Sequence, residues 1–207
     1  SLTKTITVQD ITPPVFISPV VDQSFSPGTE PGLSVGIDPD YVRAQTFTVG
    51  MAGTLSQVDV WIYNQAEGEN TAQDLVLELR NTVSGGGPAP GPALATVTVY
   101  AISIPTTPGW LSIPLSSGVP VMPGDVLAIV LSLPTAPVGS GTDYSWPGGS
   151  GYPAGECYTT TSASPGAWLS IGGDLGFRTY VSQAGCAPDK TVQCGSGWTF
   201  DTPAAID

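Results

Sequence analysis

Residues 58–63 read Val58-Asp59-Val60-Trp61-Ile62-Tyr63, and the pattern of this stretch indicates the fold class. Aliphatic side chains alternate strictly with polar or aromatic ones. Successive side chains of a β-strand point to opposite faces, so an alternating stretch has one apolar face. The stretch therefore predicts a strand whose aliphatic face covers a core, with Trp61 and Tyr63 on the opposite face.

The same period of two recurs on both sides of this stretch. Leucines alternate with other residues over 75–80, and apolar residues line one side of 111–115. Residues 126–133, VLAIVLSL, are nearly all apolar, which is typical of a strand buried on both faces. The segments between strands are rich in glycine and proline, the residues that favour turns; they are 85–88, 105–109, 122–125 and 147–150.

Many short strands with turns between them predict an all-β chain, folded as an antiparallel, jelly-roll-like β-sandwich. Because one face of each strand must be inside, the alternating aliphatic residues are expected to lie buried between two sheets. These residues are Val58, Val60, Ile62, Leu75, Leu77, Leu79, Ile113, Leu127 and Ile129.

Composition limits the classes of function. The 207 residues are 41% hydrophobic and 11% charged, so the chain is expected to fold. A net charge of −12 with five Lys and Arg residues excludes a basic patch, and we expect no nucleic-acid partner. No apolar run is long enough to span a membrane, and we expect no membrane insertion. The sequence contains no histidine, which excludes Ser-His-Asp and Cys-His catalysis and predicts that the chain is not an enzyme.

The central stretch, residues 23–181, resembles bacterial surface domains of the choice-of-anchor R type. The resemblance lies in short words in a fixed order: AQTFTV at 44–49, LSQVDVW at 55–61, LATVTV at 94–99, VPVMPGDVLAIVL at 119–131, YSW at 144–146 and DLGFRTYV at 174–181. It implies a jelly-roll sandwich in a large exported protein, with no catalytic activity.

The two ends resemble a different family. Residues 3–14 are similar to the closing strand and linker of a hyalin-repeat (HYR) module, and residues from 186 onward are similar to the opening of one. The resemblance divides the chain into 1–14, 15–184 and 185–207, with partial Ig-like strands at both ends. It implies an extracellular or cell-surface location in a tandem array. The expected partners are neighbouring modules of the same or identical chains, and a head-to-tail filament is one such arrangement.

Three cysteines are present, Cys157, Cys186 and Cys194. Zinc is disfavoured because the sequence has neither histidine nor a C-x-x-C pair. One disulfide is expected, joining Cys186 either to Cys194, through a turn at 188–189, or to Cys157; the first pairing is preferred because Pro-Asp favours a turn. The leftover cysteine suggests a partner outside this chain. Three buried reduced thiols are the alternative.

Six aromatic residues are candidates for carbohydrate binding, because exposed rings offer an apolar face to a pyranose. They are Trp61, Tyr63, Tyr144, Trp146, Tyr152 and Trp168. The first two lie on the outward face of their strand. The other four lie on or directly after the Gly-rich segment 139–167, which is read as a long loop. The alternative is that Trp146 and Trp168 pack this loop onto the sandwich.

Calcium is a candidate cofactor, since it takes carboxylate and carbonyl oxygens from loops. The candidate ligands are Asp38, Asp40, Asp143, Glu156 and Asp174, and ordinary loop caps are the alternative. Two functions follow from the sequence. The first is a structural or adhesive repeat of a bacterial surface or secreted protein. The second is a carbohydrate-binding module of a secreted multidomain enzyme, whose partner is a glycan.

Overall fold

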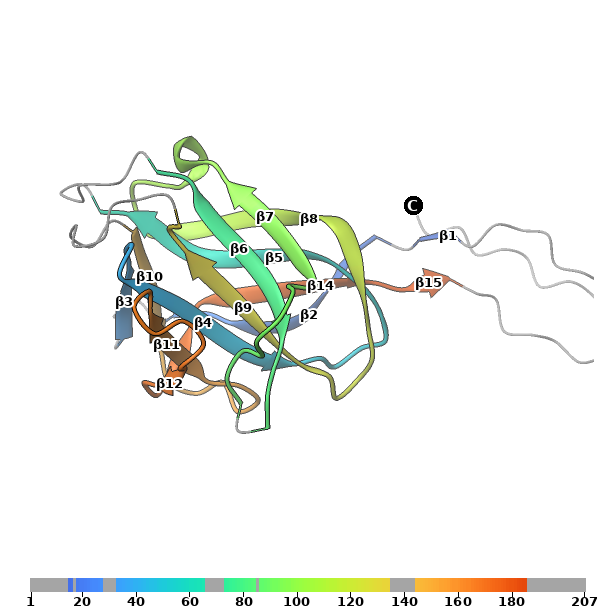
Figure 1. Cartoon of the computed structure of the whole chain (residues 1–207). Coiled ribbons are helices and arrows are strands. Elements are labelled where there is room, and N and C mark those ends of the chain that lie inside the picture. The colour runs from blue at the N-terminus through green and yellow to red at the C-terminus, as the bar shows by residue number, and fades with distance from the viewer. Residues whose placement is uncertain are drawn as a thin grey trace, which may run out of the picture.

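Two antiparallel β-sheets face each other in the computed structural model of this protein (Figure 1). The structure describes residues 15–16, 18–27, 33–65, 73–84, 86–134 and 144–185. Within these ranges the helical structure is limited to the 3-10 turn η1 (Ala101–Ser103), and no helix could cross a membrane. The all-β antiparallel sandwich predicted from the sequence is confirmed.

One sheet has seven strands in the order β13-β10-β5-β14-β2, with β3 paired to β10 and β8 paired to β5. Their bounds are β2 (Val20–Phe25), β3 (Leu33–Ile37), β5 (Gly53–Asn64), β8 (Gly109–Val121), β10 (Tyr144–Gly149), β13 (Asp174–Leu175) and β14 (Phe177–Ser182). The predicted strand at 58–63 thus forms the second half of β5, which pairs with β8, β10 and β14 of this sheet.

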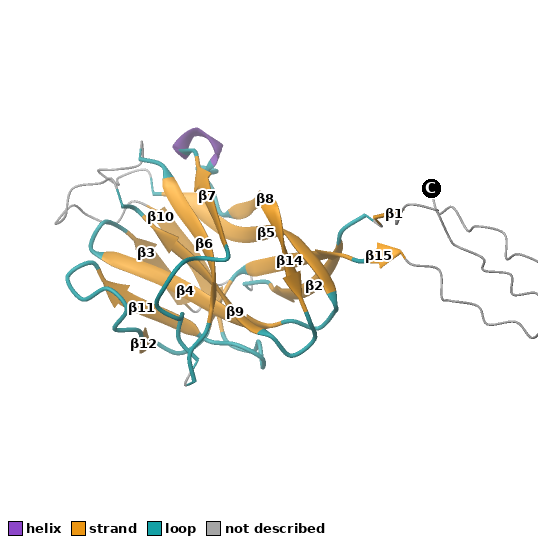
Figure 2. Cartoon of the chain, turned by 45° about the vertical axis from the view of Figure 1, so that its right-hand side comes forward, coloured by secondary structure: helices purple, strands orange, loops and turns teal. Residues whose placement is uncertain are grey.

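The other sheet has six strands in the order β12-β11-β4-β9-β6-β7 (Figure 2). Their bounds are β4 (Tyr41–Thr48), β6 (Leu75–Asn81), β7 (Ala95–Val99), β9 (Val126–Ser132), β11 (Cys157–Thr161) and β12 (Leu169–Ser170). A separate two-stranded ladder joins β1 (Val15–Phe16) to β15 (Ala184–Gly185) outside the sandwich.

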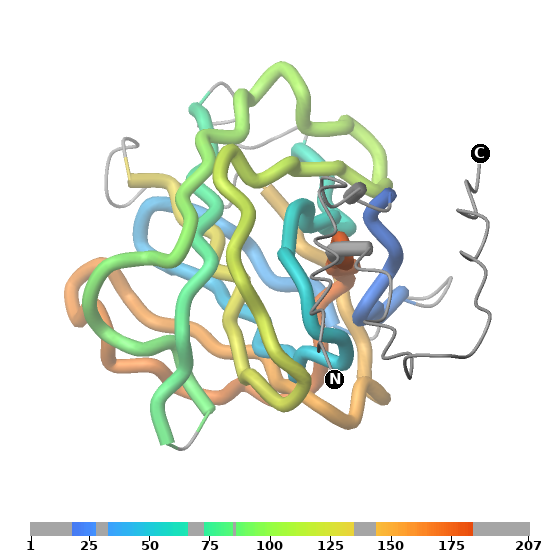
Figure 3. Tube along the Cα trace, turned by 90° about the vertical axis from the view of Figure 1, so that its right-hand side faces the viewer, coloured from blue at the N-terminus to red at the C-terminus, as the bar shows by residue number. Residues whose placement is uncertain are grey.

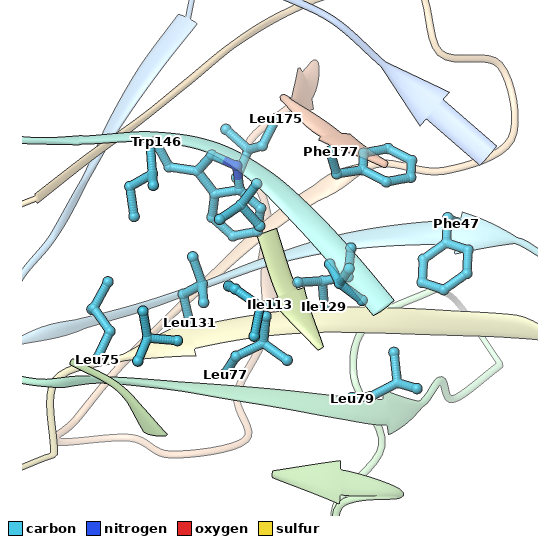
Figure 4. Close-up of a cluster of buried hydrophobic side chains, with 14 of the residues drawn as sticks. Phe47, Leu75, Leu77, Leu79, Ile113, Ile129, Leu131, Trp146, Leu175 and Phe177 are labelled. Carbon is cyan, nitrogen blue, oxygen red and sulfur yellow. The ribbon is translucent and has the colours of Figure 1, made fainter. Parts of the chain in front are cut away.

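The core lies between the two sheets, as the alternation predicted. All nine aliphatic residues of the predicted set are buried, with at most 4% of each exposed. Figure 4 shows Leu75, Leu77 and Leu79 of β6 on one side of the core and Trp146, Leu175 and Phe177 on the other. The largest of these side chains is Trp146, which is completely buried. Aromatic rings therefore fill the space that the aliphatic side chains of β5 and β6 leave.

The Gly-rich segment is not one long loop, and this prediction was wrong. Its described part forms β10 and β11, and the predicted turn at 147–150 is mostly strand, with Pro147 paired to Ser34 and Gly148 paired to Leu33. Glycine is needed at 148 because a Cβ there would lie 2.0 Å from the carbonyl oxygen of Asp174. Here glycine allows a close approach between backbones, a use in strands that composition does not distinguish from a turn.

The turn predicted at 122–125 is confirmed. Gly124 has φ +93°, a conformation that favours glycine, and its N–H donates to the carbonyl of Val49 at 2.8 Å. The predicted Ig-like strands in 1–14 and 186–207 and the preferred Cys186–Cys194 disulfide lie outside the described residues.

Candidate functional site

A groove of about 360 Å³ lies on the outer face of the six-stranded sheet. We call it the Trp168 groove, and it is lined by Val42, Glu78, Arg80, Ala89, Pro90, Gly91, Val130, Ser132, Thr160, Pro165, Gly166 and Trp168. The two central strands of this sheet, β4 and β9, carry the short side chains of Ala44 and Ala128. Both alanines are buried in a small apolar cluster with Val130 and Tyr158.

The first wall of the groove is the turn between β11 and β12. Thr160, on the outer face of β11, donates its hydroxyl to the carbonyl of Ser164 at 2.8 Å. The N–H of Ser164 donates to the carbonyl of Thr161 at 3.0 Å. These bonds curl the turn back over the sheet and place Trp168 against the apolar cluster, where its indole is partly buried.

The second wall is the segment between β6 and β7. Arg80, on the outer face of β6, donates from Nη1 to the carbonyl of Gly91 at 2.6 Å, and it holds this segment above the sheet. Its Nε donates to Oε2 of Glu78 at 2.8 Å, and both side chains are about three quarters buried. A Cβ at Gly87 would lie 3.1 Å from Cβ of Trp168, so the two walls meet beside the tryptophan.

The groove thus combines an apolar floor and an indole with a few polar groups. Ser132 and Thr160 supply hydroxyls, and Arg80 and Glu78 neutralise each other. Behind the indole, Tyr158 donates its hydroxyl to Glu156 at 3.2 Å. Burial, followed by the nearby negative charge of Glu156, raises the pKa of Tyr158, so its phenol remains a protonated donor. This is the composition of a small-molecule site: mostly apolar, with a few fixed polar groups.

Of the six aromatic residues predicted to bind carbohydrate, Trp168 lines the groove. The prediction is wrong for Tyr144 and Trp146. Neither of the latter has any exposed surface, so neither ring can stack on a glycan. The indole N–H of Trp146 donates to the carbonyl of Gly176 at 2.9 Å, and the hydroxyl of Tyr144 donates to the carbonyl of Gln73 at 2.7 Å. Because residues 144 and 146 belong to a strand and not to a loop, both side chains point into the core.

Tyr152 lies at the edge of the sandwich, with its ring edge-on to Phe177 at 5.1 Å. Its hydroxyl donates to Oε1 of Gln23 at 2.9 Å, and burial raises the pKa of Tyr152 to about 12. It packs against the core through Phe177, whereas Trp168 packs on the outer face of the six-stranded sheet. The predicted cluster of four aromatic residues therefore does not form one site.

Trp61 and Tyr63 lie on the outer face of β5, as predicted, and both are half-buried. Trp61 packs edge-on against Trp110 at 5.1 Å, and the guanidinium of Arg178 lies 3.9 Å over the ring of Trp110. Asp59 is 3% exposed and accepts from the hydroxyl of Tyr180 at 2.7 Å. Trp61 and Trp110 are therefore held by each other and by a cation, which favours a structural role for Trp61.

Three of the described calcium candidates, Asp38, Asp174 and Glu156, accept hydrogen bonds from groups of the chain itself. Oδ1 of Asp38 accepts the N–H groups of Asp40 and Tyr41, at 2.8 and 2.9 Å. Oδ2 of Asp174 accepts the N–H of Tyr152 at 3.0 Å, and Glu156 accepts from Tyr158. Among the residues that the structure describes, no three His, Cys, Asp or Glu side chains lie close enough together to hold a metal. Asp143 lies outside these residues, and calcium stays a prediction.

Cys157 is buried and its thiol is free, so the alternative Cys157–Cys186 disulfide is wrong. The side chain points into the core from β11, with no exposed surface. Burial raises the pKa of Cys157 to about 12, and the opposing effect of Arg43 is smaller.

We therefore expect Cys157 to be inert toward iodoacetamide in the folded protein at pH 8. The thiolate is the nucleophile, and a thiol whose pKa is raised so far above 8 is almost entirely protonated. Mass spectrometry of peptides from labelled protein measures the modified fraction at each cysteine. Full labelling of Cys157 in urea is the control, and rapid labelling of native protein would contradict the burial of this thiol.

Neither Arg80 nor Glu78 was predicted as a site residue from the sequence. They alternate with the buried leucines of β6, so the pattern does place both on the outer face. Nothing in the pattern shows that a segment 9 to 11 residues further along folds over them, which depends on the bonds from Arg80 to Ala89 and Gly91.

No protein-family model matches this sequence. No curated protein matches it at a significant level either. The resemblances to choice-of-anchor and hyalin-repeat modules therefore stay predictions.

Proposed function

We propose that this chain is a non-catalytic, adhesive β-sandwich module of a large bacterial surface or secreted protein, with the Trp168 groove as its adhesive site. One observation carries the proposal: two loops, each held by an outward-facing side chain, form a groove with an aromatic wall on the outer face of the six-stranded sheet. The extracellular location rests on the resemblance at the two ends.

The chemistry of the groove favours binding over catalysis. Its acidic side chain, Glu78, is paired with Arg80 at 2.8 Å and is not available as a general base. Glycosidases need two carboxyl groups that face a substrate, roughly 5–10 Å apart. The groove lining has a single carboxylate, and the sequence has no histidine to replace a second one.

A second candidate function, that of a carbohydrate-binding module, is favoured by Trp168 specifically. An indole beside an apolar floor suits the C–H face of a sugar ring, and the hydroxyls of Ser132 and Thr160 suit the sugar hydroxyls. The glycan is expected to be uncharged. A net charge of −12 repels anionic polysaccharides, and Arg80, a cation of the groove, is already paired.

The test compares three proteins on neutral and anionic polysaccharides: wild type, Trp168→Ala and Trp61→Ala. Removing the indole of Trp168 is expected to weaken binding to a neutral glycan at least about tenfold. Trp61→Ala is the matched control, since Trp61 lies on the opposite sheet and packs edge-on against Trp110. Affinity electrophoresis or calorimetry measures the change, and circular dichroism verifies that each variant folds.

Equal loss of binding in both variants would place the adhesive site elsewhere. If wild-type protein binds no glycan of either kind, the carbohydrate function is rejected and a purely structural repeat is left. Binding of anionic glycans alone would contradict the charge argument.

A further inference from the structure

The two ends of the described chain leave the sandwich side by side. β1 pairs with β15, with Val15 opposite Gly185, and β2 pairs with β14, with Val20 opposite Val181. Both pairs are antiparallel, so they follow one another as a two-stranded ribbon. Figure 1 shows β1 and β15 beyond one end of the sandwich, and Figure 3 views the molecule from that end. We call the β1–β15 pair the stalk.

The opposite pole of the sandwich is identified by the register of β5. Thr54, near the start of β5, pairs with Ser182, which lies at the stalk end of β14. Ile62, near the end of β5, pairs with Gly109 at the start of β8. Thr107, which is exposed and lies two residues before β8, is therefore far from the stalk.

This arrangement decides how the module responds to tension. Paired residues of an antiparallel ladder lie about 5 Å apart, so residues 1–14 and 186–207 are attached at neighbouring points. Pulling these two segments apart loads one pair of hydrogen bonds at a time, first in β1–β15 and then in β2–β14. A force applied between opposite poles would instead load the β2–β14, β14–β5 and β5–β8 ladders together, along the strands.

The strand that would peel first is weakly anchored at its start. β2 is the edge of its sheet, and Val20 and Val21 are 44% and 48% exposed. The polar contacts of its side chains are few: Asp22 accepts the N–H of Gly50 at 3.1 Å, and Gln23 accepts from Tyr152 at 2.9 Å. An edge strand with exposed valines has little buried apolar surface to oppose its removal.

We infer that the sandwich is a side branch of its parent chain, attached through the stalk, and not an in-line link that transmits tension. Under tension the β1–β15 pair would open first, one hydrogen-bonded pair at a time, and the β2–β14 pair would follow. For the parent chain this rests on the proposed function, because it takes the flanking segments to belong to neighbouring modules. A side branch adds no length to a tandem array of modules. Tension along the array would then not act on the Trp168 groove.

Force spectroscopy on the full chain tests the inference through the choice of attachment points. An azide-bearing residue replaces Ser18 and Gln183 in one protein and Ser18 and Thr107 in another, and all of these positions are exposed. The azide avoids the native cysteines. We expect the first protein to unfold at a several-fold lower force than the second. Fluorescence transfer between the same positions gives a second readout, with a short distance for Ser18–Gln183 and a long one for Ser18–Thr107.

Equal unfolding forces in the two geometries would overturn the inference, and so would a long Ser18–Gln183 distance. The result is independent of ligand binding. If the groove binds no glycan while the force difference is found, the adhesive function fails and the branch geometry stands. If glycan binds but the forces are equal, the reverse holds.

Discussion

Replacing Trp146 by alanine is expected to lower the free energy of unfolding by about 3–5 kcal/mol, the range for a large aromatic residue removed from a core. Trp146 has no exposed surface and lies among the largest buried side chains. The change opens a cavity between the sheets and removes the donor to the carbonyl of Gly176. That carbonyl keeps the N–H of Trp61 as a partner at 2.9 Å, so the cavity is the main cost. Urea denaturation measures the loss.

Trp168→Ala is the matched control for this prediction, because it removes the same side chain from the outer face. Trp168 is half-buried against a small cluster, and its loss is expected to cost roughly 1 kcal/mol. The two tryptophans thus separate stability from binding: Trp146→Ala unfolds the protein more easily, and Trp168→Ala leaves it folded. Equal destabilisation by the two changes would contradict the positions that the structure gives them.

The sequence predicted those parts of the fold whose strands carry an apolar face of period two. β5, β6, β8 and β9 all have such a face, and their predicted core residues are buried. The near-continuous apolar run of β9 was predicted to be buried on both faces. The structure confirms this for Leu127 to Leu131. One face covers the core, and on the other face Ala128 and Val130 belong to the outer apolar cluster, of which Val130 lines the groove.

The parts that were not predicted depend on contacts between distant segments. β10 contains proline and two glycines, so its composition favours a turn, and only its pairing with β3 and β13 shows it to be a strand. Tyr144 and Trp146 were placed on a loop for the same reason. The groove combines Val42 of β4 with Val130 of β9, and these two strands pair although they lie far apart in the sequence. No local pattern contains this pairing.

Gly148 shows what the backbone requires where composition suggested a turn. It lies in β10 between Leu33 of β3 and Leu175 of β13. A Cβ at this position would lie 2.0 Å from the carbonyl oxygen of Asp174 and 3.0 Å from Cα of Leu175. These are backbone atoms, which cannot move aside as the end of a flexible side chain can. At the next residue, Gly149, the nearest atom to a Cβ is Cζ of Phe25, at an ordinary contact distance of 3.5 Å.

Gly148→Ala is therefore expected to destabilise the fold by at least about 3 kcal/mol, because the added methyl group forces β10 and β13 apart. Gly149→Ala adds the same group one residue away and is expected to cost less than about 1 kcal/mol. Urea denaturation measures the free energy of unfolding of both variants. Replacing glycine lowers the entropy of the unfolded chain in both, so this effect cancels when the two values are compared. Hydrogen exchange should show the opening in β13 for Gly148→Ala alone. If the two alanines have the same effect, β10 does not approach β13 as closely as the structure shows, and position 148 belongs to a turn after all.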